Sequence, residues 1–298
     1  KMILVRHLRE IDSISFTDPT LVSYYQLPRG LSIALMGMTP ERRHPIDSYM
    51  GYTVFKNGLP VAYAGSWLLF DSGRIGLNVF PSYRGGESQY IFQQVLQLHA
   101  RVYRLKRFTV DPYQIGNKNS DGIYSGAFWV YYHAGFRPLL KAQQELAATE
   151  AAKIISIPRY RSTTTILKKL ADSKLELILK KNAVRFDAND LSLTYAAILK
   201  NQYNSNRLRT EKEKAKKLAA ILQIKSYEEE KMKFVLQNWS ILLLHNEAEL
   251  RSNSSLKKTL KSLFMLKASG SEEAYIRLLQ KAEVLRILVE QILKQLDI

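Results

Sequence analysis

Hydrophobic and polar positions near the middle of the chain's first half follow the two-residue period of β-strands. Tyr49 to Phe55 alternates in this way, and Val61 to Phe70 resumes the pattern after Lys56-Asn57-Gly58, a strong hairpin signal. Asp71-Ser72-Gly73 is expected to form the next turn, and Arg74 to Phe80 is again rich in residues that favour β-strands. The pattern predicts three consecutive antiparallel strands.

After these strands the period changes to that of a helix. A turn that ends in Arg84-Gly85-Gly86 leads into Ser88 to Leu105, whose apolar residues recur at helical spacing. A strand from Arg107 to Val110 and a second helical run up to Phe136 complete a β-loop-α-β-α unit. Backbone N–H groups that lead into a helix N-terminus form an anion cradle, and glycines let a phosphate approach the backbone closely.

Two features of the second helical run affect its interpretation. Its aromatic residues are too bulky to point inward together, so several must line a cavity or an interface: Phe128, Trp129, Tyr131 and Tyr132. Gly126 within a helix costs about 1 kcal/mol relative to alanine, which indicates close approach of another backbone or a ligand.

The N-terminal and C-terminal parts of the chain differ in their sequence patterns. Lys1 to Leu35 shows no clear alternation and predicts helical pieces joined by turns. Thirteen of the 14 glycines lie before residue 140, and no proline follows Pro158. Ile154 to Ile157 and Leu175 to Leu179 are short candidate strands, but from Asp187 onward the sequence pattern predicts helices. We therefore predict an α/β domain over residues 1–158, with a mixed twisted sheet and flanking helices, and a mostly α-helical domain over 159–298.

The helical part divides at Ser, Asn and Gly residues into segments 190–200, 207–222, 227–245, 254–267 and 271–296. A helical bundle or hairpin stack is expected. The residues expected at its seam are Trp239, Leu242, Leu243, Phe264, Leu278, Leu285 and Leu288.

Composition narrows the class of protein. Apolar residues make up 46% of the 298 residues, which is enough for real cores, and no run reaches the ~18 apolar residues of a membrane span. The absence of cysteine removes disulfides, thiolate catalysis and cysteine-ligated zinc, so we expect a reducing, cytoplasmic setting. The first residue is Lys1, and whether further residues precede it is open.

Net charge is +17, and most of it lies in the second half. Lys and Arg outnumber Asp and Glu by 16 to 11 over residues 1–150 and by 28 to 16 over the remainder. Such a field attracts polyanions, but acidic residues interleave the lysines, as in Glu211-Lys212-Glu213-Lys214. Ion-paired solvated faces are therefore favoured over a nucleic-acid site.

Other chemistry is absent from the sequence. The five histidines, at positions 7, 44, 99, 133 and 245, show no metal-ligand spacing, and we predict no metal. No Walker loop, dinucleotide fingerprint or nucleophile elbow occurs.

Two half-motifs at a characteristic separation carry a family resemblance. Val79-x-Pro81-x-Tyr83-Arg84-Gly85-Gly86 precedes a helix and a strand, and Ala127-Phe128-x-x-Tyr131-x-x-x-Gly135-Phe136-Arg137-Pro138 follows them. Together they resemble the GCN5-related N-acetyltransferase (GNAT) family over roughly residues 47–140. The resemblance implies acetyl-coenzyme A, or another acyl-coenzyme A, as acyl donor and an amine-type or aminoacyl acceptor.

The resemblance also implies roles for individual residues. Arg84, Gly85, Gly86 and Ser88 would hold the pyrophosphate, and the strand edge Leu77, Asn78 and Val79 would pair with the pantetheine arm. Tyr131 would be the acid that protonates the departing thiolate. Tyr24, Tyr25 and the loop from Met36 to His44 would face the acceptor.

The general base stays open, with Asp111, His133 and Glu87 as candidates. Asp111 ends the second central strand, and ligands lie at the carboxyl ends of strands in such sheets.

Two residues depart from the family pattern, which has small residues at positions 87 and 89. Glu87 would repel a pyrophosphate unless it turned away, and we favour a helix-capping role for it. Glu87 and Gln89 therefore support an alternative, a GNAT-like module that binds a ligand or partner without catalysis. A third alternative is polyanion binding by the basic helical half.

Overall fold

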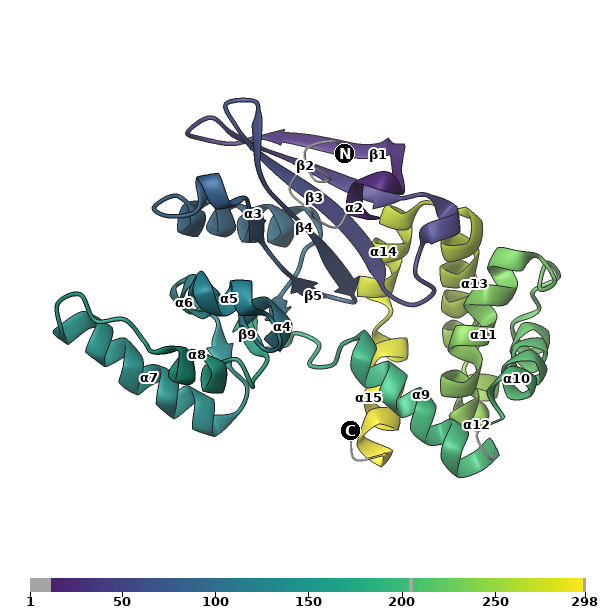
Figure 1. Cartoon of the computed structure of the whole chain (residues 1–298). Coiled ribbons are helices and arrows are strands. Elements are labelled where there is room, and N and C mark those ends of the chain that lie inside the picture. Colours follow the sequence, from purple (N-terminus) through teal and green to yellow (C-terminus); the bar gives the residue numbers. More distant parts are fainter. Residues whose placement is uncertain (1–11, 204–205, 297–298) are drawn as a thin grey trace. The chain divides into compact units, whose positions relative to one another are not determined.

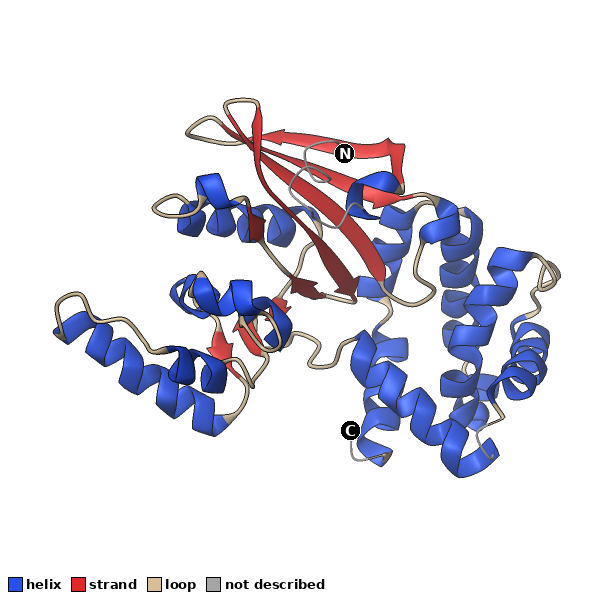
Figure 2. Cartoon of the chain, in the orientation of Figure 1, coloured by secondary structure: helices blue, strands red, loops and turns tan. Residues whose placement is uncertain are grey.

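The computed structural model describes residues 12–203 and 206–296. Within them, one unit consists of residues 12–36, 50–67 and 71–183, and a second of 37–49, 68–70 and 184–296. We call them unit 1 and unit 2. A mixed nine-stranded sheet with flanking helices is followed in the sequence by a helical region (Figures 1 and 2), so the mixed α/β class is confirmed.

The sheet has one main path and one short strand beside it. Along the path the order is β1 (Thr17–Gln26), β2 (Leu31–Met38), β3 (Ser48–Lys56), β4 (Leu59–Leu69), β5 (Ser72–Ile75), β7 (Arg107–Val110), β9 (Leu175–Ile178) and β8 (Arg137–Pro138), and β6 (Asn78–Val79) pairs with β4. The β3–β4 hairpin forms where it was predicted, because Asn57 and Gly58 both take the positive φ that a tight hairpin turn requires.

The N-terminal prediction was wrong in its described part. Residues 1–11 lie outside the described residues, and after the short helix α2 (Asp12–Ser15) the chain forms β1 and β2. Every residue of β2 is buried. A strand covered on both faces reads as a continuous apolar run, and such a run shows no alternation.

The extended segment that precedes the glycine turn loses a strand neighbour along its length, because β5 lies between β4 and β7 whereas β6 pairs with β4. Residues 72–74 in β5 pair in parallel with residues 107–109 in β7, whereas β6 pairs antiparallel with β4 at Ala62 and Tyr63. Gly76 and Leu77 lie between the two parts. In the described part of the chain β6 therefore has β4 as its only strand neighbour, and no described strand pairs with its other edge.

Unit 1 contains most of its helices after this point. Helix α3 (Ser88–Val102) is the parallel crossover to β7, as expected. The segment between β7 and β8, which contains the aromatic residues of the predicted second helical run, forms three short helices: α4 (Pro112–Ile115), α5 (Ser120–Tyr124) and α6 (Ala127–His133). One-turn 3₁₀ helices at Pro40–Arg42 and Pro81–Tyr83 complete the connections.

Residues 141–170 correct the domain boundary. Helices α7 (Lys141–Ser156) and α8 (Thr164–Leu170) pack against each other (Figure 1), and Ile154 to Ile157 lies at the end of α7 instead of in a strand. The run from Lys141 is rich in strong helix formers, which outweighs three β-branched residues. Because β9 pairs with both β7 and β8, residues 159–183 belong to unit 1 and not to the helical domain.

Unit 2 is helical apart from two connecting segments that come from the sheet region. Its helices are α9 (Ala188–Tyr203), α10 (Arg207–Leu222), α11 (Glu230–His245), α12 (Glu247–Ser252), α13 (Ser254–Ser269), α14 (Glu272–Lys281) and α15 (Glu283–Gln295). The single helix predicted from Ser271 to Leu296 is two helices that break at Ala282. The predicted seam residues lie in its core or pack against it.

Segment 37–49 is fastened to the unit 2 helices by buried polar contacts. Trp239 Nε1 donates to the Pro45 carbonyl at 3.1 Å. Lys267 Nζ donates to the Asp47 carbonyl at 2.8 Å and approaches Glu272 Oε1 at 2.5 Å, with both side chains almost fully buried. Among the described helices none is both long and apolar enough to cross a membrane.

Candidate functional site

A cavity of about 540 Å³ in unit 1 opens beside β6, and we call it the strand-edge cavity. Its wall contains most of the residues that the sequence singled out: Leu77, Asn78, Val79, Arg84, Gly85, Ser88 and Tyr131. Gly86 and Asp111 are not among the residues that line it. Positions 54 residues apart, Leu77 and Tyr131, are thus brought to one cavity, beside the point where the extended segment loses β7 as a neighbour.

Arg84 is fully engaged at the mouth of this cavity. Its Nε donates to the Val79 carbonyl at 3.1 Å, and its two terminal nitrogens donate to the two carboxylate oxygens of Asp121 at 2.8 and 2.7 Å. This bidentate pair is the strong form of a charge-assisted hydrogen bond. It connects the glycine turn to α5 and leaves the guanidinium no planar edge for an anion.

The glycines of the turn leave room over the backbone. Gly85 has φ +123°, and a Cβ placed on Gly85 or Gly86 would meet no atom within 4 Å. The Gly85 amide donates to Ser88 Oγ at 3.3 Å, and the Ser88 amide donates to the Gly85 carbonyl at 3.0 Å. A ligand can therefore approach this backbone closely, as a phosphate cradle requires.

Tyr131 is the buried aromatic of the cavity. Only 2% of its surface is exposed, and its ring packs edge-on against Phe92 and Phe136, with centroids at 4.9 and 5.9 Å. Burial raises the pKa of the Tyr131 hydroxyl well above its ordinary value, and a hydrogen bond with the Leu77 backbone lowers it by less. The hydroxyl therefore stays protonated at neutral pH and lies beside the strand edge.

Its neighbours on α6 face elsewhere. Tyr132 stacks on Phe128, with ring centroids 5.8 Å apart, and the Arg137 guanidinium lies 4.0 Å from the centroid of the Tyr132 ring. It does not line the strand-edge cavity. On this helix Tyr131 therefore lines the strand-edge cavity and Tyr132 does not.

The two departures from the motif have structural explanations. Glu87 is the N-cap residue of α3 by position, but its side chain makes no capping bond. Its carboxylate pairs with Lys56 at 3.0 Å instead, so the capping role expected for it was wrong and its charge is turned toward a cation. With Nε2 toward the Val130 carbonyl (3.1 Å) and Oε1 toward the Ala134 amide (3.0 Å), Gln89 bridges α3 and α6.

Asp111 and Gly126 have other roles than those first considered. Asp111 Oδ2 lies 3.1 Å from Arg74 Nη1 and away from the strand-edge cavity. Gly126 lies between α5 and α6 and not inside a helix. It takes φ +63°, and a Cβ there would meet nothing within 4 Å, so backbone conformation explains this glycine and close approach of another backbone does not.

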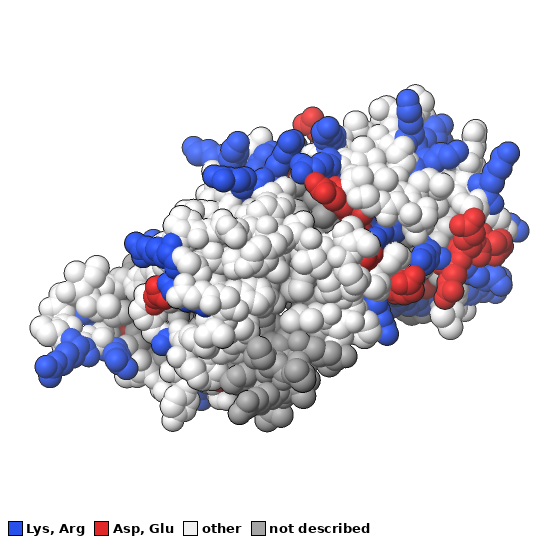
Figure 3. Space-filling view, turned by 90° about the horizontal axis from the view of Figure 1, so that it is seen from above, with Lys and Arg blue, Asp and Glu red and all other residues white. Residues whose placement is uncertain are grey.

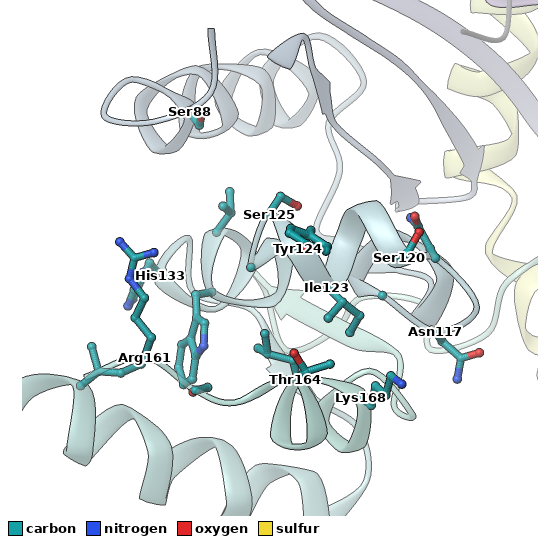
Figure 4. A pocket seen from close by; sticks show the side chains of 18 of the residues that line it. Ser88, Asn117, Ser120, Ile123, Tyr124, Ser125, His133, Arg161, Thr164 and Lys168 are labelled. Atoms are coloured by element: carbon teal, nitrogen blue, oxygen red, sulfur yellow. The ribbon is translucent and has the colours of Figure 1, made fainter. Parts of the chain in front are cut away.

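A second cavity, of about 1380 Å³, lies in unit 1 between the N-terminus of α3, the α5–α6 region and α8 (Figure 4). We call it the α8 cavity. It shares Gly85, Ser88, Asn119, Tyr124, Ser125 and Val130 with the strand-edge cavity, so the two are contiguous. His133 lines it, and so do Lys118, Arg161 and Lys168.

Sequence reasoning missed the α8 cavity. Its wall runs from Gly85 to Asp172 and carries no motif at fixed spacing. The only signal in the sequence was the group of Arg and Lys residues between Arg159 and Lys169.

Within residues 12–203 and 206–296 no group of three or more His, Cys, Asp or Glu side chains could hold a metal ion. Comparisons with models of known protein families, with curated proteins and with solved structures gave no match. The geometry and chemistry of the two cavities therefore carry the functional argument.

Proposed function

We propose that the chain is an acyltransferase that moves an acyl group from acyl-coenzyme A to an amine. The observation that carries this proposal is the strand-edge cavity, where an unpaired strand edge, an open glycine turn and a buried, protonated tyrosine converge. Sequence motifs had named these three features independently, through the resemblance to GNAT proteins.

Each feature would perform one part of the transfer. The free edge of β6 would pair with the amide groups of the pantetheine arm, and the backbone at Gly85 and Gly86 would receive the pyrophosphate. Acyl-coenzyme A supplies the thioester. The amine nitrogen bonds to the acyl carbon, the carbon–sulfur bond breaks, and Tyr131 gives its hydroxyl proton to the departing sulfur. The amine loses one proton to water, and water returns one proton to the Tyr131 phenolate, so that the enzyme regains its starting state.

The cavity favours a particular kind of amine. Among the residues that the structure describes, Asp121 is the only carboxylate that lines it, and both of its oxygens accept from Arg84. An α-amino group has a pKa near ~8 and is partly neutral at neutral pH, whereas a lysine amine near ~10.4 is not. An α-amine or aminoacyl acceptor therefore needs less help from a base, and we propose that class.

Calorimetry with acetyl-coenzyme A and with free coenzyme A tests the proposal. We expect heat and a thermal shift for the wild-type protein. Ala127→Phe places a ring in the cavity wall and should abolish both, whereas Ala148→Phe, on an exposed position of α7, should leave both unchanged. No heat from the wild-type protein at millimolar ligand would overturn the proposal.

The Arg84–Asp121 pair favours a second candidate, a ligand or partner module without catalysis, because a carboxylate at the turn opposes a phosphate. Asp121→Asn separates the two candidates. If the wild-type protein binds no coenzyme A and the variant does, the turn has been closed to phosphate by Asp121.

Nucleic-acid binding by unit 2 is not proposed. Several of its basic side chains pair along the helices, as Arg207 does with Glu211 and Arg251 with Glu247. Figure 3 shows acidic side chains among the basic ones on the face that it presents. A phosphate-binding stripe needs uncompensated cations in a row.

A further inference from the structure

The short link of Gly76 and Leu77, between β5 and β6, is held by side chains from other elements of unit 1. Tyr52, which is fully buried in β3, donates from its hydroxyl to the Gly76 carbonyl. The hydroxyl of Tyr131 in α6 bonds with the Leu77 backbone. Neither Gly76 nor Leu77 belongs to a strand, so these two tyrosines fix a link that no strand pairing holds.

Gln114 packs against the same link. A Cβ placed on Gly76 would lie 3.0 Å from both Cδ and Oε1 of Gln114 and 3.3 Å from its Nε2. These distances are shorter than an ordinary van der Waals contact. Only glycine at position 76 therefore lets the carboxamide approach the backbone this closely.

The carboxamide of Gln114 is unused within the protein. Gln114 is partly buried and lines the strand-edge cavity, and its side chain makes no hydrogen bond to a described residue. Its helix, α4, is nevertheless fixed, because Ile115 is buried and Asn119 Nδ2 donates to the Tyr113 carbonyl at 2.9 Å. An amide that is held in place and offers two donors and an acceptor is available to a ligand.

Most other polar side chains of this cavity already bond within unit 1. They are those of Arg84, Ser88, Asn119, Asp121 and Ser125. Asn78 and Tyr124 make no hydrogen bond to a described residue either, but it is Gln114 that packs on Gly76. Its donor thus lies one residue along the backbone from the contact of the Tyr131 hydroxyl.

We propose that Gln114 is a catalytic residue of the acyl transfer, and that its Nε2 donates a hydrogen bond to the carbonyl oxygen of the acyl group. This inference rests on the proposed function, in which Tyr131 lies beside the sulfur to which the acyl carbon is bonded. When the amine nitrogen bonds to that carbon, the carbonyl electron pair moves to the oxygen, which becomes an oxyanion. The carboxamide stabilises this charge until the carbon–sulfur bond breaks and the carbonyl forms again, and Gln114 keeps its proton throughout.

Calorimetry with three probes tests the inference before any acceptor is known. The probes are free coenzyme A, acetyl-coenzyme A and S-ethyl-coenzyme A, a thioether of similar size that has no carbonyl oxygen. We expect the wild-type protein to bind acetyl-coenzyme A about 2- to 10-fold more tightly than S-ethyl-coenzyme A, the range of one neutral hydrogen bond.

Variants assign that preference to one side chain. Gln114→Leu removes the donor and keeps most of the volume, so it should abolish the preference and leave the affinity for S-ethyl-coenzyme A unchanged. Gln114→Ala should do the same, which guards against a leucine that packs poorly. Gln93→Leu, at an exposed position of α3 that does not line the cavity, should keep the preference.

Turnover gives a second readout once an acceptor is found. Loss of one oxyanion donor should lower kcat by ~100- to 1,000-fold in Gln114→Leu, whereas the KM for acetyl-coenzyme A should rise by no more than ~10-fold. Full kcat in both Gln114 variants would overturn the inference.

The outcomes separate this inference from the proposed function. If the wild-type protein binds coenzyme A but does not distinguish the acetyl from the S-ethyl form, the inference is overturned and the function stands. The same holds if the preference survives in both Gln114 variants, or if Asn78→Ala abolishes it and they do not. If none of the three probes binds the wild-type protein, the proposed function fails and this inference fails with it.

Discussion

Charged side chains serve different ends in the two units. Unit 2 buries a lysine against a carboxylate, with Lys267 and Glu272 exposed by 1% and 4%, and pairs several of its exposed arginines with a carboxylate one helical turn away. Unit 1 instead has three cations on the α8 cavity, Lys118, Arg161 and Lys168, that pair with no described residue, and it keeps a tyrosine hydroxyl protonated in the strand-edge cavity. The difference teaches that charge satisfied within the fold marks stability, whereas charge left open marks a place for a ligand.

The largest effect is expected from breaking the buried pair of unit 2. Burial lowers the pKa of Lys267, while Glu272 raises it by less, so the group is held at a cost that only its partners offset. Lys267→Ala removes the nearer cation of the buried Glu272 and leaves it only Arg43, whose Nε lies 3.6 Å from Glu272 Oε2. The free energy of unfolding, measured by urea denaturation, should fall by about 3 kcal/mol, the low end of the range for broken buried pairs. Lys261→Ala, an exposed position on the same helix, is the control. Equal, small losses in both variants would contradict the comparison.

In unit 1, Tyr131→Phe should lower the rate of turnover and leave the stability unchanged. It removes one hydroxyl from the strand-edge cavity and little volume, so stability and coenzyme binding should persist while turnover falls by ~100-fold. The measurement is steady-state turnover once an acceptor is found. Tyr132→Phe, on the next position of α6, should keep full rate, and the reverse result would show that the register assigned to this helix is wrong.

Unit 1 also contains Glu150, a buried carboxylate whose partners lie within the fold. Burial raises its pKa, but the hydrogen bonds from Lys153, Tyr160 and Ser162 together bring the pKa below the ordinary 4.5. Its contribution to stability is therefore complete above that value and is lost as pH falls through the lower, folded-state pKa. Glu150→Gln should cost about 1–3 kcal/mol at neutral pH.

The pH dependence checks that sign. Unfolding curves of wild type and Glu150→Gln should converge as pH is lowered from neutral to below 4.5. A gap that stays constant would mean that the charge of Glu150 does not contribute.

The smallest effect is expected on the surface of unit 2. Arg209 and Glu213 form an ion pair one turn apart, with side chains 76% and 61% exposed. Solvent screens such a pair, so Arg209→Ala should leave the unfolding midpoint unchanged within error. A clear shift would show that exposed pairs also support this unit.

Local patterns predicted the elements whose neighbours in sequence decide their structure. The Asn57-Gly58 hairpin, α3 and the start and end of α10 follow from turn chemistry and helical periodicity, and the structure has them. Strand β2 could not be predicted, because it is covered on both faces and that property belongs to the folded sheet. Helix α7 was missed for a different reason, because its cause is local: the strong helix formers from Lys141 onward outweigh the β-branched residues near Ile154.

The candidate site likewise contains residues that local patterns predict and contacts that they do not. The strand edge, the turn and Tyr131 could be found because their motifs lie within about sixty residues at family spacing. The pairing of Arg84 with Asp121, the turning away of Glu87 toward Lys56, and the convergence of Lys118 with Lys168 all join residues that no local pattern relates. They became visible only with the fold.

Segment 37–49 belongs with unit 2, although it is made long before the helices that it contacts. At a synthesis rate of ~5–20 residues per second, roughly 10 to 40 seconds separate Asp47 from Lys267 on the ribosome. During that interval the segment has been synthesised but the helices that it contacts have not. A fragment that begins at residue 184 would likewise lack the Pro45 and Asp47 carbonyls that Trp239 and Lys267 bind, so the helical unit cannot be excised from this gene as one continuous piece with its contacts intact.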